Sequence, residues 1–287
     1  MPDRDPPDLG NPTDPAPSAD AGMPTDAGQP TDLGFSGPAS ARVYDYSLGG
    51  KDNYGADRQA ASEALGMHRV AHLLPRENRK FMRRAVRHLL DAGVRQFIDL
   101  GCGLPGKGNV HDLAHAADPD ARVVYVDSDP VAVVHYQSLV HTVKGVAAVN
   151  GDARRPAEIL ESPEVTALID FDLPVGVLMI SMLDWIQDED DPDAVVAAFR
   201  DALAPGGHLV ICDFLSDHLT EADWAAHHDL TERYGIPLTF RSSQRFAGWF
   251  EGLDLVDPGL VPAPEWRPDR PYDPPSGWLM AGVGRKP

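Results

Sequence analysis

Two short apolar runs of the chain each end in residues suited to holding a nucleoside. The run from Phe97 to Leu100 breaks at Gly101-x-Gly103, and the run from Val123 to Val126 closes on Asp127. Glycines at a strand end let a ligand approach the backbone closely, and an aspartate closing the next strand can accept hydrogen bonds from both hydroxyls of a ribose. The spacing therefore predicts a cofactor that contains a nucleoside.

Neighbouring residues separate the possible cofactors. Together with Gly106, the glycines also match the dinucleotide fingerprint, so an NAD(P)-dependent oxidoreductase is an alternative. Pro105 lacks the N–H that a diphosphate would need, and Asp99 places at the strand end a carboxylate that would repel a diphosphate. The same carboxylate attracts ammonium and sulfonium groups. S-adenosylmethionine carries both cations and no phosphate, so the pattern favours it.

Later runs of the chain add side chains to the same site. Asn150-Gly151-Asp152-Ala153 follows the apolar run 146–149, and Asp152 could accept a hydrogen bond from the exocyclic amine of adenine. Ser181-Met182-Leu183-Asp184 follows the run 175–180. In an open α/β sheet the ligand crevice lies at the carboxyl ends of the strands. We therefore expect one cleft lined by Asp99, Asp127, Asp152 and the segment 181–184.

An alternation of strands and helices must position these residues. From Gln96 onward, strands are predicted at 96–100, 146–149, 175–180 and 208–212, and a further strand is predicted to end at Val126. Helices are predicted to begin at Asn109 and at Pro130, and a third is predicted over 193–203. Then follow helix 221–234, strand 238–240, helix 243–251 and strands near 253–256 and 278–283. This alternation is typical of an α/β fold with a parallel sheet wound by helices.

The residues before the sheet are expected to cover it. Residues 41–54 are predicted to form an ordered loop, because they are too aromatic for a linker and are broken by glycines. Helices predicted at 57–74 and 77–92 form a cap, with one buried face that contains Phe81, Val86, Leu89 and Leu90. We treat 41–287 as one domain, with lid and cap helices at 41–95 and a Rossmann-like core at 96–287.

The composition restricts the compartment and the partners. Residues 1–40 are rich in Pro, Asp, Gly, Ala and Thr and are predicted to be a disordered tail, because they cannot recover the entropy of ordering. The chain shows neither a signal peptide nor a membrane-spanning run, so we expect a cytoplasmic protein with no membrane partner. A formal net charge of -19 argues against a nucleic-acid partner. The basic cluster from Arg76 to Arg87 is interpreted as a solvated helix face.

Metal and disulfide chemistry is not expected. Cys102 and Cys212 are the only cysteines, each predicted at a strand end, so neither a disulfide framework nor a thiolate zinc site is available. His111 and His115 have the spacing of the two ligands in helical zinc proteases, but the residue after His111 is aspartate rather than glutamate. We assign both histidines structural or surface roles and predict no metal.

The sequence resembles the S-adenosylmethionine-dependent methyltransferase family of high-GC, actinobacterial-type bacteria, which was formerly catalogued as a domain of unknown function. The resemblance covers 41–287 and is most specific in Tyr44-Asp45-Tyr46-Ser47-Leu48-Gly49-Gly50-Lys51-Asp52-Asn53-Tyr54, the YDYxLGGKDNY motif. The other matching segments are Glu77-Asn78-Arg79, Asp99 to Pro105, Gly108 to His111, Val124 to Pro130 and Ala281 to Lys286.

The resemblance implies a Rossmann-like class I methyltransferase fold, with a seven-stranded, mostly parallel sheet, N-terminal cap helices and S-adenosylmethionine in the crevice. The motif would lie beside the cofactor as a lid, where the rings of Tyr44, Tyr46 and Tyr54 could face the sulfonium. Alternatively, these rings fill the gap between the cap helices and the sheet. The residues expected to bind the cofactor are Tyr44, Tyr46, Gly49, Gly50, Asn53, Tyr54, Asp99, Gly101, Gly103, Asn109, Asp127, Ser128, Asp152, Ala153 and Ser181.

The expected function is methyl transfer to a small-molecule acceptor at oxygen or nitrogen. Family members often carry histidine where this chain has Asp184 and Asp213, and a base is needed only when the acceptor must lose a proton. We therefore assign no catalytic residue firmly; Asp184 is a weak candidate, and a helix-entry role fits it as well. One alternative is a protein that binds the cofactor without turnover. The oxidoreductase is a weaker one, because the second half of the chain lacks a Tyr-x-x-x-Lys pair.

Overall fold

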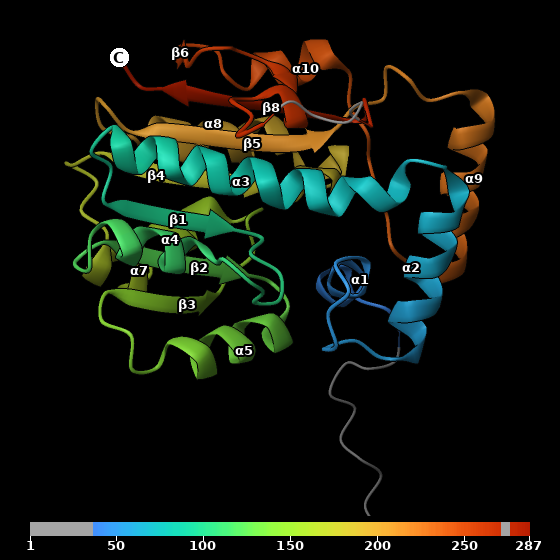
Figure 1. The fold of residues 1–287 in the computed structure, drawn as a ribbon, viewed down its shortest axis with the longest axis horizontal. Coiled ribbons are helices and arrows are strands. Elements are labelled where there is room, and N and C mark those ends of the chain that lie inside the picture. Colours follow the sequence, from blue (N-terminus) through green and yellow to red (C-terminus); the bar gives the residue numbers. More distant parts are fainter. Residues whose placement is uncertain (1–36, 271–275) are drawn as a thin grey trace, which may run out of the picture. The chain divides into compact units, whose positions relative to one another are not determined.

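An eight-stranded mixed β-sheet forms the centre of the computed structural model, which describes residues 37–270 and 276–287 (Figure 1). The strand order is β3-β2-β1-β4-β5-β8-β6, and β7 also pairs with β8. The pairs from β3 to β5 are parallel, whereas β8 runs antiparallel to β5, β6 and β7. The strands are β1 (Gln96–Leu100), β2 (Arg122–Asp127), β3 (Val146–Asn150), β4 (Val175–Ile180), β5 (His208–Phe214), β6 (Asp254–Leu255), β7 (Val261–Pro262) and β8 (Leu279–Arg285).

The middle strands of the parallel part are covered on both faces. β1 is buried along its whole length, and β4 is buried up to its half-buried last residue. A strand covered on both sides is rich in apolar residues, which is why the bounds of β1 and β4 could be predicted from the sequence. Leu100 pairs with Val126 of β2 and with Met179 of β4. This register brings the residues that follow the three strands to the same edge of the sheet.

Helices cover both faces of the sheet. Side chains of α3, α4 and α5 join one buried apolar cluster, and those of α8 and α10 join another. In Figure 1, α3 crosses in front of the sheet and α8 lies behind it. None of the helices in the described ranges has the length and apolar character needed to span a membrane. The α-helices are α1 (Ser40–Ser47), α2 (Gly55–Met67), α3 (Leu74–Asp91), α4 (Val110–Ala117), α5 (Pro130–Val140), α6 (Pro156–Leu160), α7 (Pro163–Leu168), α8 (Pro192–Asp201), α9 (Glu221–Tyr234) and α10 (Ser243–Gly248).

Four short 3-10 helices join these elements. They are η1 (Ala71–Leu73), η2 (Leu183–Trp185), η3 (Asp188–Asp190) and η4 (Ala263–Glu265). η2 follows β4 directly, so it lies next to the edge of the sheet where the parallel strands end. Its position makes it a candidate wall for any site at that edge.

α3 buries the face predicted from its apolar spacing. Phe81, Val86 and Leu89 are fully buried, and Leu90 is nearly so. Phe81 meets Trp266 edge to face, with 5.4 Å between the ring centroids. Truncating a buried aromatic side chain of this kind costs about 3–5 kcal/mol, so this contact fixes α3 and the C-terminal segment together.

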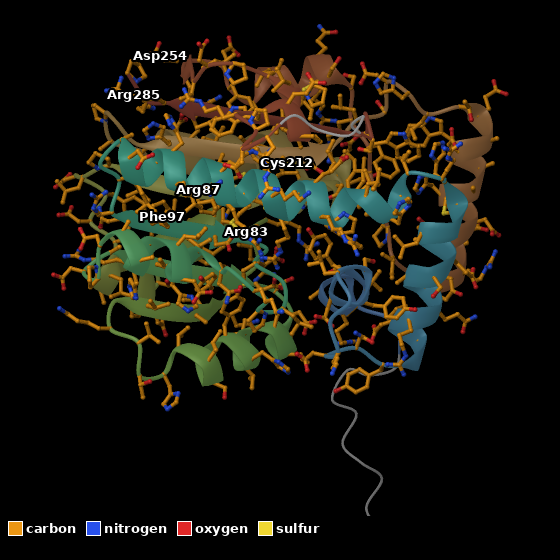
Figure 2. The ribbon with its side chains drawn as sticks, in the orientation of Figure 1. Arg83, Arg87, Phe97, Cys212, Asp254 and Arg285 are labelled. Carbon is orange, nitrogen blue, oxygen red and sulfur yellow. The ribbon has the colours of Figure 1, made fainter. Side chains whose placement is uncertain are left out.

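The basic cluster of α3 is only in part the solvated face that we predicted, because Arg76, Lys80 and Arg87 are exposed and Arg84 is not. Arg84 is buried, and its guanidinium donates to the carbonyl oxygens of Trp266 and Ala263 at 2.7 and 2.6 Å. Arg87, which Figure 2 labels on α3, is exposed and pairs with Asp269. A guanidinium can be buried when carbonyl oxygens satisfy its donors, and those partners are supplied by a distant segment that periodicity does not reveal.

Several elements differ from the predicted ones. Residues 41–54 begin with α1 rather than forming only a loop, and the helix predicted at 57–74 ends at Met67. The expected strand 238–240 is absent from this described region, where Leu215 and Arg241 form an isolated bridge instead. β6 is a two-residue edge strand, in which Asp254 faces Arg285 at 4.0 Å (Figure 2).

Only part of the predicted disordered tail, residues 1–40, can be compared with the structure. Residues 1–36 of the predicted disordered tail lie outside the described residues. Ser40, assigned to that tail, is the first residue of α1. The division of 41–287 into lid and cap helices at 41–95 and a core at 96–287 stays a prediction.

Candidate functional site

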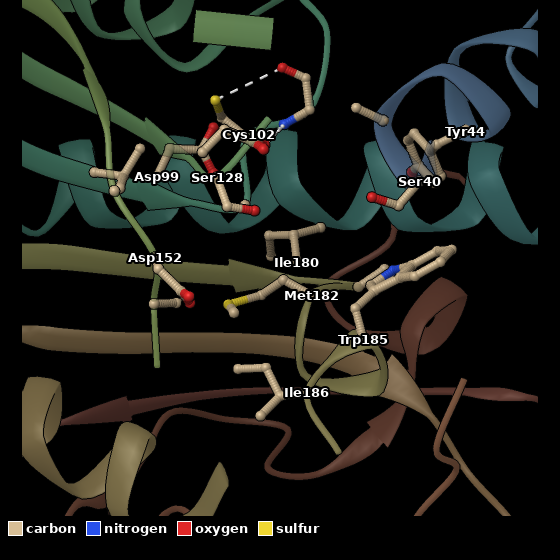
Figure 3. Close-up of a pocket in the computed structure, with 18 of the residues that line it drawn as sticks. Ser40, Tyr44, Asp99, Cys102, Ser128, Asp152, Ile180, Met182, Trp185 and Ile186 are labelled. Carbon is tan, nitrogen blue, oxygen red and sulfur yellow. Dashed lines mark hydrogen bonds between the residues drawn. The ribbon is translucent and has the colours of Figure 1, made fainter. Parts of the chain in front are cut away.

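A cavity of about 310 Å³ lies at the carboxyl ends of the parallel strands (Figure 3). Its walls come from the residues that follow β1, β2, β3 and β4, from α1 and α3, and from η2. The sequence-predicted site residues on these walls are Tyr44, Asp99, Gly101, Gly103, Asp127, Ser128, Asp152, Ala153 and Ser181. The carboxylates expected at successive strand ends therefore meet in one cleft.

The turn after β1 keeps its backbone open to this cavity. Gly101 and Gly103 have φ values of +63° and +64°, a region that residues with a side chain rarely adopt. A Cβ on Gly101 would lie 2.7 Å from Cβ of Met182. Glycine at this position therefore satisfies both the backbone angle and the close packing of the turn against the residues that follow β4.

Asp127 holds this turn while facing the cavity. Its Oδ2 accepts a hydrogen bond from the Gly103 N–H at 2.7 Å, and its Oδ1 accepts one from the Asp129 N–H at 2.9 Å. Burial raises the pKa of Asp127, and the two amide donors oppose that rise. Because each carboxylate oxygen can accept a second hydrogen bond, Asp127 keeps the capacity to bind hydroxyl groups.

Asp99 and Arg79 supply opposite charges to the same wall. Asp99 is 5% exposed, and burial raises the pKa of its carboxyl to about 7, opposed by the Arg79 guanidinium and assisted by the Asp127 charge. The predictions did not include Arg79 as a site residue, although it belongs to the matching segment Glu77-Asn78-Arg79. A carboxyl and a guanidinium on one wall suit the ammonium and carboxylate groups of an amino acid.

Asp152 is already paired with its neighbour. The Nε and Nη2 atoms of Arg154 donate to its carboxylate at 2.9 and 2.7 Å, and the Nη1 atom reaches Asp190 of η3 at 3.1 Å. These bonds lower the pKa of Asp152 against the effect of its burial. Arg154 also lines the cavity. A hydrogen bond from adenine to Asp152, as expected from the sequence, would share this carboxylate with Arg154.

A hydrogen-bonded bridge joins α1 to the residue after β4. The Nδ2 atom of Asn78 donates to Oη of Tyr44 at 3.0 Å and to Oγ of Ser181 at 2.8 Å. Tyr44 donates its own hydroxyl proton to the carbonyl oxygen of Pro75. Ser181 has a φ of +49°, and its N–H donates to the carbonyl oxygen of Cys212 at 2.7 Å. Such strain in a non-glycine residue is typical of functional sites.

Much of the YDYxLGGKDNY motif does not line the cavity. The expected cofactor-binding residues outside its walls are Tyr46, Gly49, Gly50, Asn53 and Tyr54. Asp45 accounts for part of the pattern, because its carboxylate accepts from the Asp52 N–H at 3.0 Å and from Nδ2 of Asn53 at 2.8 Å. A Cβ on Gly50 would overlap that carboxylate. Gly50, Asp52 and Asn53 therefore pack around the carboxylate of Asp45 in a turn.

Another part of the motif leads into a buried ion pair. Asp57 is fully buried and accepts from the backbone N–H of Ala39, from that of Tyr54 and from Nε of Arg42. Its Oδ2 lies 3.0 Å from Nε of Arg42. This carboxylate therefore fixes both ends of the segment that carries Tyr44, and its role is structural.

Two further predicted residues also lie off the cavity. Asn109 is buried, where its Oδ1 accepts from the Gly106 N–H at 2.9 Å and its N–H donates to Asp112, so it orders the start of α4. Asp184, the weak catalytic candidate, is 1% exposed and is not part of the cavity wall. Burial raises its pKa to about 7 and that of Asp213 beside it well above the ordinary value.

The cavity also has walls that sequence reasoning did not anticipate. They include Ser40, Met82, Trp185, Ile186 and Pro237, besides the two arginines. Trp185 and Ile186 follow the segment 181–184 immediately, so the signal that predicted this segment could have been extended by two residues. Pro237 comes from a segment with no recognisable motif, and only the fold brings it to the site.

The histidines with zinc-like spacing have other partners. The His111 N–H donates to Oη of Tyr125 at 2.8 Å, and its Nδ1 lies 2.7 Å from the same oxygen. His115 contacts the carbonyl oxygen of Ala121 through Nε2. Within residues 37–270 and 276–287, no group of three or more His, Cys, Asp or Glu side chains could hold a metal ion.

Comparisons with known proteins agree with this geometry. A crystal structure of a candidate methyltransferase from Thermobifida fusca shares 39% identity, covers 91% of this chain and 99% of its own, and superposes with a TM-score of 0.83. A DUF574 family protein from Streptomyces avermitilis shares 32% identity, covers 89% of this chain and 100% of its own, and also gives a TM-score of 0.83. The fold is thus that of the α/β class I methyltransferases.

No curated protein matches the chain. The family model described as S-adenosyl methyltransferase matches residues 26–287, which is most of the sequence. The chain therefore belongs to the S-adenosyl methyltransferase family, whose cofactor is S-adenosylmethionine.

Proposed function

We propose that this protein is a cytoplasmic enzyme that methylates a small-molecule acceptor at oxygen or nitrogen. The observation that carries the proposal is the convergence of Asp99, Asp127 and Arg79 on one cavity, beside a glycine turn that leaves the backbone accessible. These groups match an amino acid joined to a ribose, which is the part of S-adenosylmethionine next to its reactive sulfur. The net charge of -19 favours a small acceptor over a nucleic acid.

Each part of the cofactor has a matching group on the cavity wall. Asp127 would accept hydrogen bonds from the ribose hydroxyls, and Asp99 would face the ammonium and sulfonium charges. Arg79 would bind the carboxylate. The adenine would lie toward the residues after β3, next to Asp152 and Ala153.

The chain's own residues act here chiefly by binding and alignment. When bound, S-adenosylmethionine supplies an electrophilic methyl group on its sulfonium. A nucleophilic oxygen or nitrogen must then be held in line with the carbon–sulfur bond, and such alignment alone can lower a barrier by several kcal/mol. Ser181 is suited to orient the acceptor, because its Oγ accepts from Asn78 and its own proton remains available for donation.

Calorimetric titration with S-adenosylmethionine, S-adenosylhomocysteine and NAD tests the cofactor assignment. We expect both sulfur compounds to bind the wild-type chain, and the Asp127→Ala substitution to weaken them by at least about tenfold, because a hydrogen bond to a charged group contributes about 1.5–3 kcal/mol. Asp201→Ala is the matched control, because Asp201 is exposed and lies outside the cavity. Binding of NAD alone would contradict the proposal.

Turnover needs a separate measurement, because a protein that binds the cofactor without reaction would pass the titration. The purified chain is incubated with S-adenosylmethionine and a panel of phenols, amines and heteroaromatic compounds. Formation of S-adenosylhomocysteine that depends on one acceptor would support an enzyme. Tight cofactor binding without turnover on any acceptor of these classes would favour the silent binding protein.

A further inference from the structure

We propose that the end of the cavity between Tyr44 and Trp185 is the acceptor site and that it takes an uncharged aromatic ring. This inference rests on the proposed function, because it assigns the remainder of the cavity to S-adenosylmethionine. It goes beyond that function by specifying the chemical class of the acceptor.

The order of the strands sets the order of the residues along the cavity. Asp152 follows β3, Asp127 ends β2, and Gly101 follows β1, so the nucleoside and the amino acid part of the cofactor would extend from β3 toward β4. Beyond β4 the wall continues with Trp185 of η2. In Figure 3, Asp152 lies at one end of the cavity, and Tyr44 and Trp185 lie at the other. The second end is the part left for an acceptor.

The walls of this end are aromatic and apolar. Figure 3 shows Tyr44 and Trp185 on opposite sides of it, with Ser40 next to Tyr44. Ile186 and Pro237 also line the cavity. Aromatic rings provide large, rigid contact surfaces and stack favourably on other rings, so two of them across a gap suit a flat ligand better than a puckered one.

Tyr44 offers a fixed ring and little hydrogen-bonding capacity. Its hydroxyl group donates to the carbonyl oxygen of Pro75 and accepts from Asn78, at 3.2 and 3.0 Å. The guanidinium of Arg79 lies 5.8 Å from the centroid of the ring. These contacts hold the ring in place before any ligand arrives, so little conformational freedom would be lost on binding.

The charges on the cavity wall are all accounted for by the cofactor or by each other. Arg154 pairs with Asp152. Asp127, Asp99 and Arg79 match the ribose, the cationic groups and the carboxylate of the cofactor. Among the residues that the structure describes, these five are the charged ones on the wall.

No formal charge therefore remains on the wall for the acceptor. The side chains that Figure 3 places at the acceptor end, those of Ser40, Tyr44 and Trp185, carry none, and the Arg79 guanidinium beside the Tyr44 ring is assigned to the carboxylate of the cofactor. A charge buried without a partner is strongly disfavoured, so a carboxylate or an ammonium group on the ring would be selected against. Hydroxyl groups of Ser40 and Ser181 remain to meet a neutral oxygen or nitrogen.

The test compares four probes of one ring size on the chain saturated with S-adenosylhomocysteine. Phenol is flat and neutral, cyclohexanol is puckered and neutral, benzoate is an anion, and benzylamine is a cation near neutral pH. Their dissociation constants are measured by ligand-observed NMR titration. We expect phenol to bind at least about fivefold more tightly than each of the other three, because only phenol satisfies both shape and charge.

Variants of the tryptophan locate the binding. Trp185→Ala should weaken phenol at least about fivefold, and Trp185→Phe should retain most of the affinity because it keeps an aromatic face. Trp224→Ala is the matched control, because Trp224 is exposed and lies outside the cavity. The affinity of each variant for S-adenosylhomocysteine should equal that of the wild type. This measurement also shows that the variant has folded.

The possible outcomes separate the two proposals. Cofactor binding together with equal affinity for phenol and cyclohexanol, or with preference for a charged probe, would overturn the acceptor inference and leave the proposed function standing. Loss of S-adenosylhomocysteine affinity in a folded Trp185→Ala variant would assign Trp185 to the cofactor and overturn the inference as well. If the wild-type chain binds no S-adenosylhomocysteine, the proposed function fails and this inference with it.

Discussion

Protonation of Asp99 should control how tightly the cofactor binds in mildly acidic solution. Burial raises the pKa of this carboxyl to about 7, with Arg79 opposing the rise and Asp127 adding to it. S-adenosylmethionine brings positive charges to the wall that Asp99 occupies, so it binds the ionised form in preference. Below the raised pKa, binding must first displace a proton, and the affinity therefore increases with pH.

The size of the effect follows from the fraction of ionised carboxyl. With a pKa of about 7, roughly half of the Asp99 side chains are ionised at about pH 7 and roughly 3% at about pH 5.5. The association constant should therefore rise about fifteenfold over this range, which corresponds to about 1.6 kcal/mol. The α-amino group of the cofactor stays largely charged throughout, because its ordinary pKa is about 8.

Calorimetric titration at the two pH values, each in two buffers of different ionisation enthalpy, measures both the affinity and the protons released. Asp99→Asn is expected to bind S-adenosylmethionine more weakly at about pH 7 and to lose most of the pH dependence. Asp201→Asn, outside the cavity, should behave as the wild type. An equal pH dependence in wild type and Asp99→Asn would refute the reasoning.

Three further substitutions test the scaffold of the site. Asp57→Ala should lower the free energy of unfolding in urea by about 3–5 kcal/mol, because it leaves the Arg42 guanidinium buried without this carboxylate. Asp184→Asn should raise the midpoint of thermal unfolding more at about pH 8 than at about pH 5.5, because a raised carboxyl pKa stabilises the fold at acidic pH and that stabilisation is lost as the pH rises through it. Gly101→Ala should weaken S-adenosylmethionine at least about tenfold in a calorimetric titration, because the new Cβ displaces Met182.

Control variants or contrary results can test these three expectations. Lys144→Ala, which breaks an exposed ion pair, should leave the unfolding free energy unchanged, and an equally small change for Asp57→Ala would contradict the buried pair. For Asp184→Asn, the same shift at both pH values would exclude linkage to protonation. Gly93→Ala imposes a similar backbone strain at φ +92° where the space is open, so cofactor affinity should fall for Gly101→Ala only.

The strands and the carboxylates at their ends could be predicted, because both depend on local pattern and a general rule of topology. β4 is a continuous apolar run and β1 is apolar except for Gln96 and Asp99, since helices cover both faces of a parallel sheet. Once the strands are parallel, their carboxyl ends share an edge. That rule alone was enough to bring Asp99, Asp127 and Asp152 to one cavity.

The structure of the YDYxLGGKDNY segment was harder to predict, because it is held by short-range hydrogen bonds between polar groups. Gly49 and Gly50 suggested a lid, but the turn that contains them is organised by the carboxylate of Asp45. Asp184 illustrates a second difficulty. It follows β4 as predicted, but its side chain is 1% exposed and lies off the cavity wall, and that direction depends on packing that no spacing encodes.

The cavity is assembled from residues that lie far apart in the chain. Ser40 and Tyr44 from α1 line the same cavity as Trp185 and Pro237. Asn78 donates a hydrogen bond to Ser181, which lies 103 positions further along the chain. During synthesis, the N-terminal wall is made long before its counterpart, so no early fragment can present a complete site. Cofactor binding therefore reports that the whole chain has folded, and a ligand at one hundred times its Kd would add about 2.7 kcal/mol to the stability of all these segments together.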